Sequence, residues 1–224
     1  MLEQFDRRVV AEPLLSLVRA CQRRVPCHLG GGAALSGAFL AHRLTAALDL
    51  FCHSHDDYAQ LRRDLPALGA ETGVELRILR DAATFARFLA GLPDGARVEL
   101  DLVEDLVPDV EPPAPVEGVL VESLADLRAN KLTCLLSRSE PRDLVDLMFL
   151  DRAGYPPEAD LALALRKDGG MDPGVLTWLL NQFPCRPLPR MLQPLTEGEL
   201  LAFRQDLQRR FRRIAVPADP DTNS

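Results

Sequence analysis

The sequence predicts an α+β protein with a mixed first half and an entirely helical second half. Short apolar runs alternate with amphipathic stretches as far as residue 121, whereas apolar residues recur only at helical spacing after Ser123. Hydrophobic residues make up 47% of the 224 residues, which is enough for a packed core. We therefore expect a mixed core domain at residues 1–122 and a helical domain, packed on the core, at residues 123–224.

Local sequence signals set the elements of the first half. Pro13 suits the first turn of a helix, the glycines at 30–32 turn the chain, and Pro93-Asp94-Gly95 favours a hairpin. The expected helices are 11–24, 33–43 and 56–70, and the expected strands are 25–29, 48–52, 74–79, 97–103 and 119–121. Residues 84–92 fit either a strand or a helix, and the hairpin favours a strand.

The second half follows a proline-rich stretch, residues 107–118, which is expected to be an extended crossover. Ser123 is a plausible N-cap for the first of the later helices. These are expected near 123–138, 141–152, 157–167, 172–182 and 195–214. Trp178 lies among leucines in the fourth of them and is expected in the core.

Charge, hydropathy and cysteine usage narrow the class of protein. The net charge of −7 argues against a general nucleic-acid binder, and no apolar run is long enough to cross a membrane. No secretory signal is apparent at the N-terminus. Five widely spaced cysteines without a Cys-x-x-Cys pair fit reduced thiols. These features predict a cytoplasmic protein.

A glycine turn followed by a helix and an acidic strand is the most informative pattern in the chain. Gly31 and Gly32 bring backbone close to where phosphate oxygens could bind, and Asp49 lies on the next strand. A carboxylate there could hold a metal ion against those phosphates. Asp101 lies on the polar face of a later strand, and Glu99 shares that face as a second choice of ligand.

Two helices of the second half carry buried-looking charges. Lys131 falls on an apolar helical stripe, so its ammonium group needs either a route to water or an anion, an aspartate or a phosphate, and we favour the anion. Arg138 and Arg142 are four residues apart and would repel unless an anion lies between them. Asp143 and Asp146 or a nucleotide phosphate could supply it; the alternative is a purely structural salt-bridge network.

These two blocks of sequence resemble the AbiEii/AbiGii-type nucleotidyltransferase toxins, a family with the polymerase-β type of fold. The matching residues are Gly31-Gly32-Ala33-Ala34-Leu35, His42 to Thr45, Leu48 to Phe51, Lys131 to Arg138 and Arg142 to Leu147. The resemblance implies a nucleotidyltransferase-type mixed sheet. It also implies transfer of a nucleotide from a nucleoside triphosphate (NTP) to an acceptor such as tRNA or a protein, in a toxin–antitoxin or phage-defence system with a cognate antitoxin.

The resemblance also implies roles for individual residues. Asp49 and Asp101 would bind Mg²⁺ or Mn²⁺, and Gly31 and Gly32 would seat the phosphates. Lys131 and Arg138 would contact the nucleotide, while Asp143 would orient Lys131 or act as a base. Arg43 would either neutralise phosphate or hold the end of its helix through a carboxylate.

The chain departs from the family pattern at one metal-binding position. The first carboxylate of the Asp-x-Asp pair is replaced by Ala47, whose neighbour is Ala46. Loss of one of three carboxylates should weaken metal binding and leave little or no turnover, whether Ala47 is natural or an engineered inactivation. A non-catalytic regulator that binds a nucleotide or a protein partner is therefore the alternative, and an RNA-holding basic helix near residues 200–214 is a third.

Overall fold

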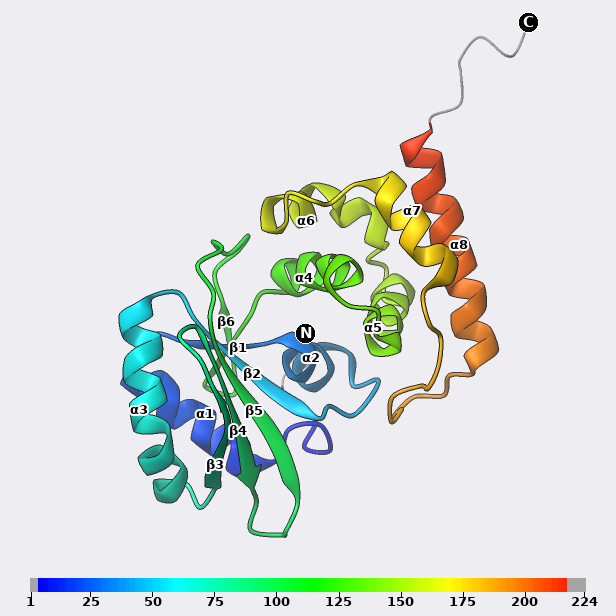
Figure 1. The fold of residues 1–224 in the computed structure, drawn as a ribbon. Helices are drawn as coiled ribbons and strands as arrows, with labels where there is room; N and C mark the ends of the chain where they lie inside the picture. Colours follow the sequence, from blue (N-terminus) through cyan, green and yellow to red (C-terminus); the bar gives the residue numbers. More distant parts are fainter. Residues whose placement is uncertain (1–3, 217–224) are drawn as a thin grey trace, which may run out of the picture. The chain divides into compact units, whose positions relative to one another are not determined.

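The computed structural model describes residues 4–216, and the chain divides into two compact units, Met1–Leu127 and Arg128–Ser224 (Figure 1). The first unit combines a seven-stranded sheet with helices. The second consists of helices and their connections. This architecture confirms the α+β prediction.

The sheet of the first unit is mixed. Its strands lie in the order β3-β4-β5-β2-β1-β7-β6, with β2 parallel to β5, β1 parallel to β7, and the other neighbours antiparallel. The strands are β1 (His28–Gly30), β2 (Ala47–Cys52), β3 (Glu75–Asp81), β4 (Phe85–Gly91), β5 (Arg97–Glu104), β6 (Ala114–Val116) and β7 (Val119–Val121). Residues 84–92 thus contain a strand, as the hairpin favoured.

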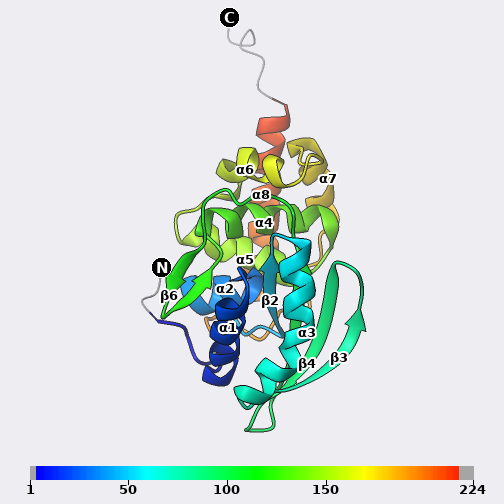
Figure 2. The same ribbon diagram turned by 90° about the vertical axis from the view of Figure 1, so that its left-hand side faces the viewer.

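The two faces of the sheet have different chemistry. Alternation along β2 and β5 places Leu48, Leu50 and Leu100 in the core, where they are fully buried. Helices α1 (Glu12–Arg24) and α3 (His55–Glu71) lie side by side over this face (Figure 2). The opposite face therefore carries the residues at odd positions of β2 and β5, including Asp49 and Asp101.

The helix expected at 33–43 begins and ends earlier than predicted. A four-residue helix, α2 (Gly31–Ala34), continues into a π-helical turn, η1 (Leu35–Leu40). The turn ends at Ala41, which has a left-handed backbone with φ of 48° and donates its amide to Ser36 at 2.8 Å. As a result Arg43 lies beyond the helix, in a buried connection to β2.

The proline-rich stretch contains a strand that the sequence interpretation missed. β6 and β7 form a hairpin whose turn residues, Glu117 and Gly118, have φ of 47° and 73°. Positive φ at both positions matches the right-handed twist of a hairpin. Pro115 is tolerated because β6 is an edge strand with one side free of sheet pairing.

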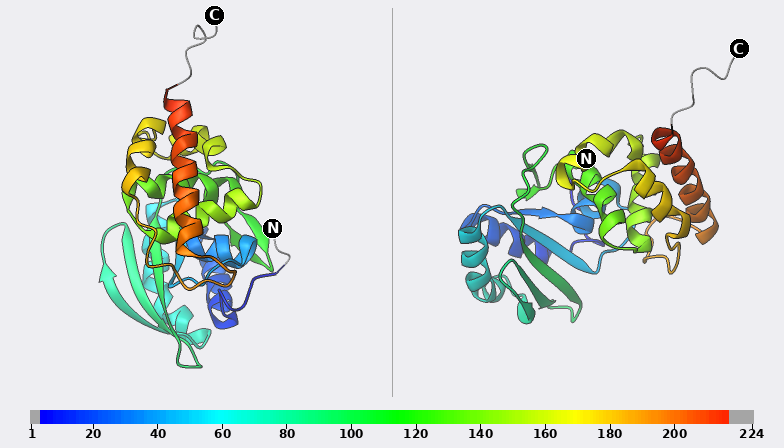
Figure 3. Two further views of the ribbon diagram at one scale, coloured as in Figure 1. Left: turned by 90° about the vertical axis from the view of Figure 1, so that its right-hand side faces the viewer. Right: turned by 45° about the horizontal axis from the view of Figure 1, so that its top comes forward.

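The second unit contains the helices that the periodicity predicts. α4 (Leu124–Ser137) begins in the first unit, and η2 (Pro157–Asp160) runs into α6 (Leu161–Lys167). The others are α5 (Pro141–Arg152), α7 (Pro173–Gln182) and α8 (Glu197–Ala215), with α7 packed along α8 (Figure 3). Trp178 was expected in the core but is 65% exposed, because α7 buries Leu176 and Leu180 instead.

Arginines on the basic face of α8 contact carboxylates and a backbone carbonyl of the same unit. Arg210 contacts Asp151 at 2.8 Å and Glu158 at 2.9 Å, and Arg204 donates to the carbonyl of Phe183. The apolar side of the helix buries Phe203, Leu207 and related residues. These contacts favour a packed structural helix over an RNA-holding one.

Two further features of the described residues concern membrane-spanning helices and cysteines. Among residues 4–216, no helix combines the length and the apolar character needed to cross a membrane. All five cysteines are free, as predicted.

Candidate active site

The glycine turn packs directly against Asp49. Gly31 follows β1, and Gly30 is the register partner of Asp49 on β2. The backbone of Gly31 has φ of 61°, and a Cβ atom there would lie 2.2 Å from Oδ2 of Asp49. Only glycine fits this position, because any side chain would be both strained and in collision. A Cβ on Gly32 would similarly lie 2.7 Å from a terminal nitrogen of Arg43.

Parallel pairing of β2 and β5 gathers carboxylates on the face opposite α1 and α3. Asp49 is in register with Asp101, and Ala47 is in register with Glu99. Paired strands lie about 4.8 Å apart, so these side chains are immediate neighbours. Strand alternation predicted that Asp101 and Glu99 share a face, and the family resemblance associated Asp49 with Asp101. Position 47 contributes a methyl group in the same row.

Arg87 on β4 is a participant that the sequence interpretation did not include. It is the register partner of Asp101 and binds it through two hydrogen bonds, each 2.7 Å long. A third contact joins Arg87 to Glu99 at 3.0 Å. The hydrogen bonds that Arg87 donates to Asp101 raise the pKa of Arg87 above its ordinary value, despite the opposing effect of burial. If residues 84–92 are treated as a strand, alternation places Arg87 on one of its two faces. The contact with Asp101 then follows from the pairing of β4 with β5.

Glu122 lies at the glycine turn as well. Its carboxylate accepts a hydrogen bond from the amide of Gly31 at 3.2 Å, and the side chain is only 3% exposed. The amide predicted to face a phosphate therefore faces a carboxylate here. No local signal reveals this contact, because it arises from pairing of β1 with the distant β7.

The donor set on this face suits one divalent cation. Asp49 and Asp101 offer adjacent carboxylate oxygens, which are the ligands that Mg²⁺ prefers. Ala47 offers no ligand, and both oxygens of Asp101 accept hydrogen bonds from Arg87. The residues therefore fit one cation, provided that Arg87 yields to it, and do not fit a pair of cations sharing a ligand at position 47.

The second unit holds a compact ionic cluster formed by α4 and α5. The ammonium group of Lys131 lies 2.7 Å from Asp146 and 3.3 Å from Asp143, and both carboxylates are fully buried. Arg138 makes two further hydrogen bonds to Asp143, at 2.8 and 2.9 Å. The aspartate partners expected for Lys131 and Arg138 are thus present.

The expected shared helix face of Arg138 and Arg142 is wrong, because Arg138 follows the end of α4 whereas Arg142 lies in α5. Arg138 binds Asp143, whereas Arg142 pairs with Glu140 at 2.7 Å. Burial alone would raise the pKa of the Asp143 carboxyl, but the hydrogen bonds from Arg138 and the charge of Lys131 hold that pKa below its ordinary value. Asp143 is therefore an ionised group in the folded chain at neutral pH.

Comparison with known proteins connects these features to one family. A family model described as nucleotidyl transferase AbiEii toxin, type IV TA system, matches residues 17–224. No curated protein sequence matches this chain significantly.

Among solved structures, JHP933 from Helicobacter pylori superimposes with a TM-score of 0.57 at 20% identity, over 92% of this chain and 96% of that one. MenT4, a nucleotidyltransferase toxin from Mycobacterium tuberculosis, gives a TM-score of 0.56 at 14% identity, over 90% and 85% of the two chains. The similarity extends through most of each protein.

Proposed function

This chain belongs to the AbiEii nucleotidyltransferase toxin family, and from that premise we propose that it transfers a nucleotide from an NTP to an acceptor, at a rate lowered by Ala47. One observation carries the proposal. The in-register carboxylates of Asp49 and Asp101 lie beside a glycine turn, on the face of the first unit's sheet opposite α1 and α3. This combination serves metal-assisted phosphoryl chemistry.

Candidate residues in each of the two units have a proposed role. Asp49 and Asp101 would hold Mg²⁺ or Mn²⁺, which would stabilise the negative charge that develops on the phosphate. Gly31 and Gly32 admit the triphosphate because they carry no side chain, and Arg43 adds positive charge beside Gly32. Lys131 and Arg138 are assigned to nucleotide phosphate, with Asp143 orienting both through the contacts it already makes.

Arg87 gives the site a further property. Its guanidinium neutralises Asp101 and Glu99, so a cation that binds Asp101 must displace two charge-assisted hydrogen bonds. Together with the methyl group of Ala47, this contact lowers the affinity for metal. We therefore expect turnover only at high concentrations of Mg²⁺ or Mn²⁺.

The test is the transfer of label from each α-³²P NTP to total RNA and to protein. At high enzyme concentration, we expect slow labelling that requires Mg²⁺ or Mn²⁺ and that Asp49→Asn abolishes. The labelled fraction identifies the acceptor class. Absence of label with both this chain and its Ala47→Asp variant would contradict the proposal.

A non-catalytic regulator is the second candidate, because position 47 is apolar and Arg87 occupies both oxygens of Asp101. Such a protein would bind an NTP through its glycine turn and arginines without metal. Calorimetric titration with each NTP, with and without Mg²⁺, separates the two. Affinity that is independent of metal, together with no label transfer, would favour the regulator.

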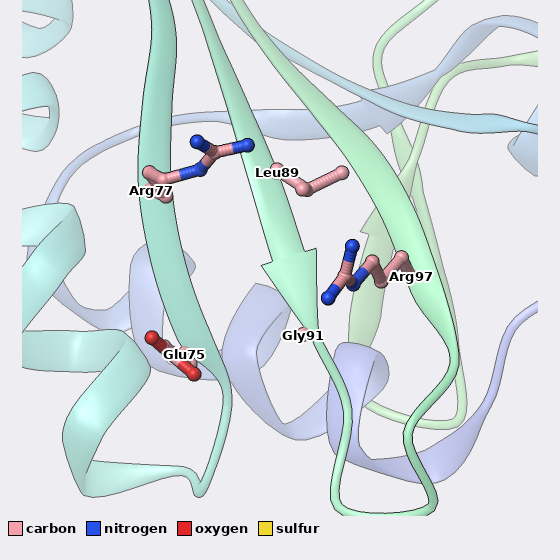
Figure 4. A pocket seen from close by; sticks show the side chains of 5 residues that line it. All are labelled: Glu75, Arg77, Leu89, Gly91 and Arg97. Atoms are coloured by element: carbon pink, nitrogen blue, oxygen red, sulfur yellow. The ribbon is translucent and has the colours of Figure 1, made fainter.

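A basic hollow on the same sheet supports RNA as the acceptor. It has a volume of about 270 Å³ and is lined by Glu75, Arg77, Leu89, Gly91 and Arg97. The guanidinium groups of Arg77 and Arg97 extend from β3 and β5 toward the middle strand (Figure 4). Both side chains are exposed, and within residues 4–216 neither pairs with a carboxylate. Two exposed cations that line one hollow suit contact with the phosphates of a nucleic-acid backbone.

Charge reversal of these two arginines should weaken RNA binding. For Arg77→Glu with Arg97→Glu we expect at least a tenfold loss of tRNA affinity and a salt dependence reduced by about 1.5–2 in logarithmic slope. Filter binding across a salt series measures both. Arg23→Glu is the matched control, since Arg23 is exposed on α1, which covers the other face. Equal losses in the control and the double variant would contradict this acceptor site.

Two further proposals concern the partner of the protein and its location. A type IV toxin implies a cognate antitoxin, whose gene would lie beside that of this chain. The five free cysteines suit the reducing cytoplasm that we propose as its location.

A further inference from the structure

Two histidines and an aspartate, distant in sequence, meet at the end of β1 and β2. One ring nitrogen each from His28 and His53 and one carboxylate oxygen of Asp109 all lie within 4.8 Å of one another. No sequence spacing could have shown this cluster, because its members come from β1, the β2–α3 connection and the proline-rich stretch.

His53 lies between two hydrogen-bond acceptors, and a neutral imidazole can donate to only one of them. Nδ1 of His53 lies 2.7 Å from the backbone carbonyl of Asp105, which can only accept, so Nδ1 carries the proton. Nε2 of the same ring lies 3.2 Å from the carboxylate of Asp109, which also accepts. A neutral ring has a single N–H, so the second contact needs either an additional proton or a cation between the two atoms.

The arrangement around His53 is the one that metal-binding histidines use. A ligating imidazole commonly donates its other N–H to a backbone carbonyl, which fixes the tautomer and directs the free nitrogen at the metal. The contact with Asp105 does this for His53. The lone pair of Nε2 then points toward Asp109 and the neighbouring ring of His28, whose centroid is 5.1 Å away.

His28 supplies a buried, unused nitrogen donor. The residue is 4% exposed, and its ring stacks on Phe51 with a centroid separation of 5.6 Å. Within the part of the chain that the structure describes, its side chain has ring contacts and no hydrogen bond. A nitrogen of this ring is one of the three ligand atoms that lie within 4.8 Å of one another, so it is placed to bind a cation.

Asp109 is held in position by its neighbours along the chain. The amides of Val110 and Glu111 donate to the buried carboxylate of Asp126, at 2.7 and 3.0 Å. On the other side, the amide of Val107 donates to Asp105 at 3.0 Å. These contacts fix an otherwise irregular segment, so that the third ligand does not depend on a free loop.

We propose that His28, His53 and Asp109 form a binding site for a borderline divalent cation of the Zn²⁺ class, separate from the carboxylate site at Asp49 and Asp101. Two imidazoles and one carboxylate are ligands typical of Zn²⁺ or Co²⁺, whereas Mg²⁺ prefers oxygen alone. Tetrahedral bonds of about 2.0–2.1 Å place ligand atoms roughly 3.4 Å apart, which small side-chain rotations achieve here. The bound cation would tie the proline-rich stretch to the end of β1 and β2.

Cobalt is the probe for this site, because Co²⁺ bound to nitrogen ligands absorbs visible light. The untagged full-length chain should bind one equivalent of Co²⁺ in the presence of millimolar Mg²⁺, which fills sites made of oxygen alone. Zn²⁺ should displace the Co²⁺ and remove the absorption. His53→Gln and Asp109→Asn should each weaken Co²⁺ binding at least about 100-fold, as expected for the loss of a direct ligand.

His55→Gln is the matched control, because His55 lies two residues from His53, is 68% exposed and contacts Glu104. This variant should bind Co²⁺ like the unchanged chain. Circular dichroism establishes that each variant is folded, and His53 is exposed enough (39%) for its replacement to be tolerated. A chain without Co²⁺ absorption, or equal losses in His53→Gln and His55→Gln, would overturn the proposal.

Discussion

Replacing Ala47 by aspartate should raise the rate of nucleotide transfer by at least about 100-fold at a fixed, low Mg²⁺ concentration. A new carboxylate at position 47 would project from the same face of β2 as Asp49, because side chains two residues apart in a strand share a face. It would also lie opposite Glu99 in the register with β5. Loss of a supporting group alone changes metal affinity or activity 10–100-fold, so gain of a direct ligand should do at least as much.

The same substitution should also weaken the hold of Arg87 on Asp101. A fourth carboxylate on this face adds negative charge beside Glu99, which Arg87 already contacts at 3.0 Å. The guanidinium can shift toward the new charge, and Asp101 then becomes available to the cation. The apparent Mg²⁺ or Mn²⁺ constant for transfer should therefore fall along with the rise in rate.

Ala46→Asp is the control for this experiment. It adds the same charge one residue earlier, at an exposed position immediately before β2, on the side away from Asp49. We expect no increase in transfer from Ala46→Asp, and none from Ala47→Asp combined with Asp49→Asn. Equal gains from Ala46→Asp and Ala47→Asp would mean that overall charge, not a ligand at position 47, limits the rate.

The sequence determined most of the elements because their signals are local. Pro13, the glycines and the Pro93-Asp94-Gly95 turn each act on adjacent residues. The helices and strands around them were therefore predicted, although the ends of the elements beside the glycines were displaced by two or three residues. Asp101 was placed on the correct face for the same reason, since strand alternation is local. The prediction that Trp178 lies in the core was wrong, because the face that α7 buries contains Leu176 and Leu180 and not Trp178.

The contacts that give the site its character depend on strand order, which no local pattern encodes. Arg87 reaches Asp101 only because β4 pairs with β5 in one register. Glu122 meets the amide of Gly31 because β7 pairs with β1. His28 and Asp109 are 81 positions apart along the numbering and are joined only by the fold. A sequence can indicate which residues carry chemistry, whereas their partners follow from the topology.

Replacing Lys131 by methionine should lower the free energy of unfolding by about 3–5 kcal/mol. The substitution keeps most of the side-chain volume but leaves Asp146 without the ammonium group that lies 2.7 Å away. Removing one partner of a buried ion pair leaves an uncompensated charge in a medium of low polarity, which accounts for the size of the loss. Denaturant unfolding followed by circular dichroism at pH 7 measures it.

Three further measurements separate this cause from others. Arg166→Met removes an exposed charge from α6 and should change the free energy of unfolding by no more than about 0.5 kcal/mol. Adding Asp146→Leu to Lys131→Met should recover stability, because the unpaired charge is gone. If the double variant is stable yet fails to transfer label in an Ala47→Asp background, Lys131 serves the nucleotide as well as the fold.

The pH dependence of the free energy of unfolding shows whether the loss in Lys131→Met is electrostatic. The pKa of Asp143 is lowered in the folded chain, so its ion pairs contribute fully above its unfolded pKa of about 3.9 and are lost as the pH falls through the lower folded value. In Lys131→Met, Asp143 and Asp146 lose the nearby ammonium charge, so they can take up protons at higher pH. The destabilisation should therefore be constant from pH 7 to about pH 5 and shrink toward pH 3. A loss of equal size at pH 7 and pH 3 would instead indicate a packing defect around the methionine.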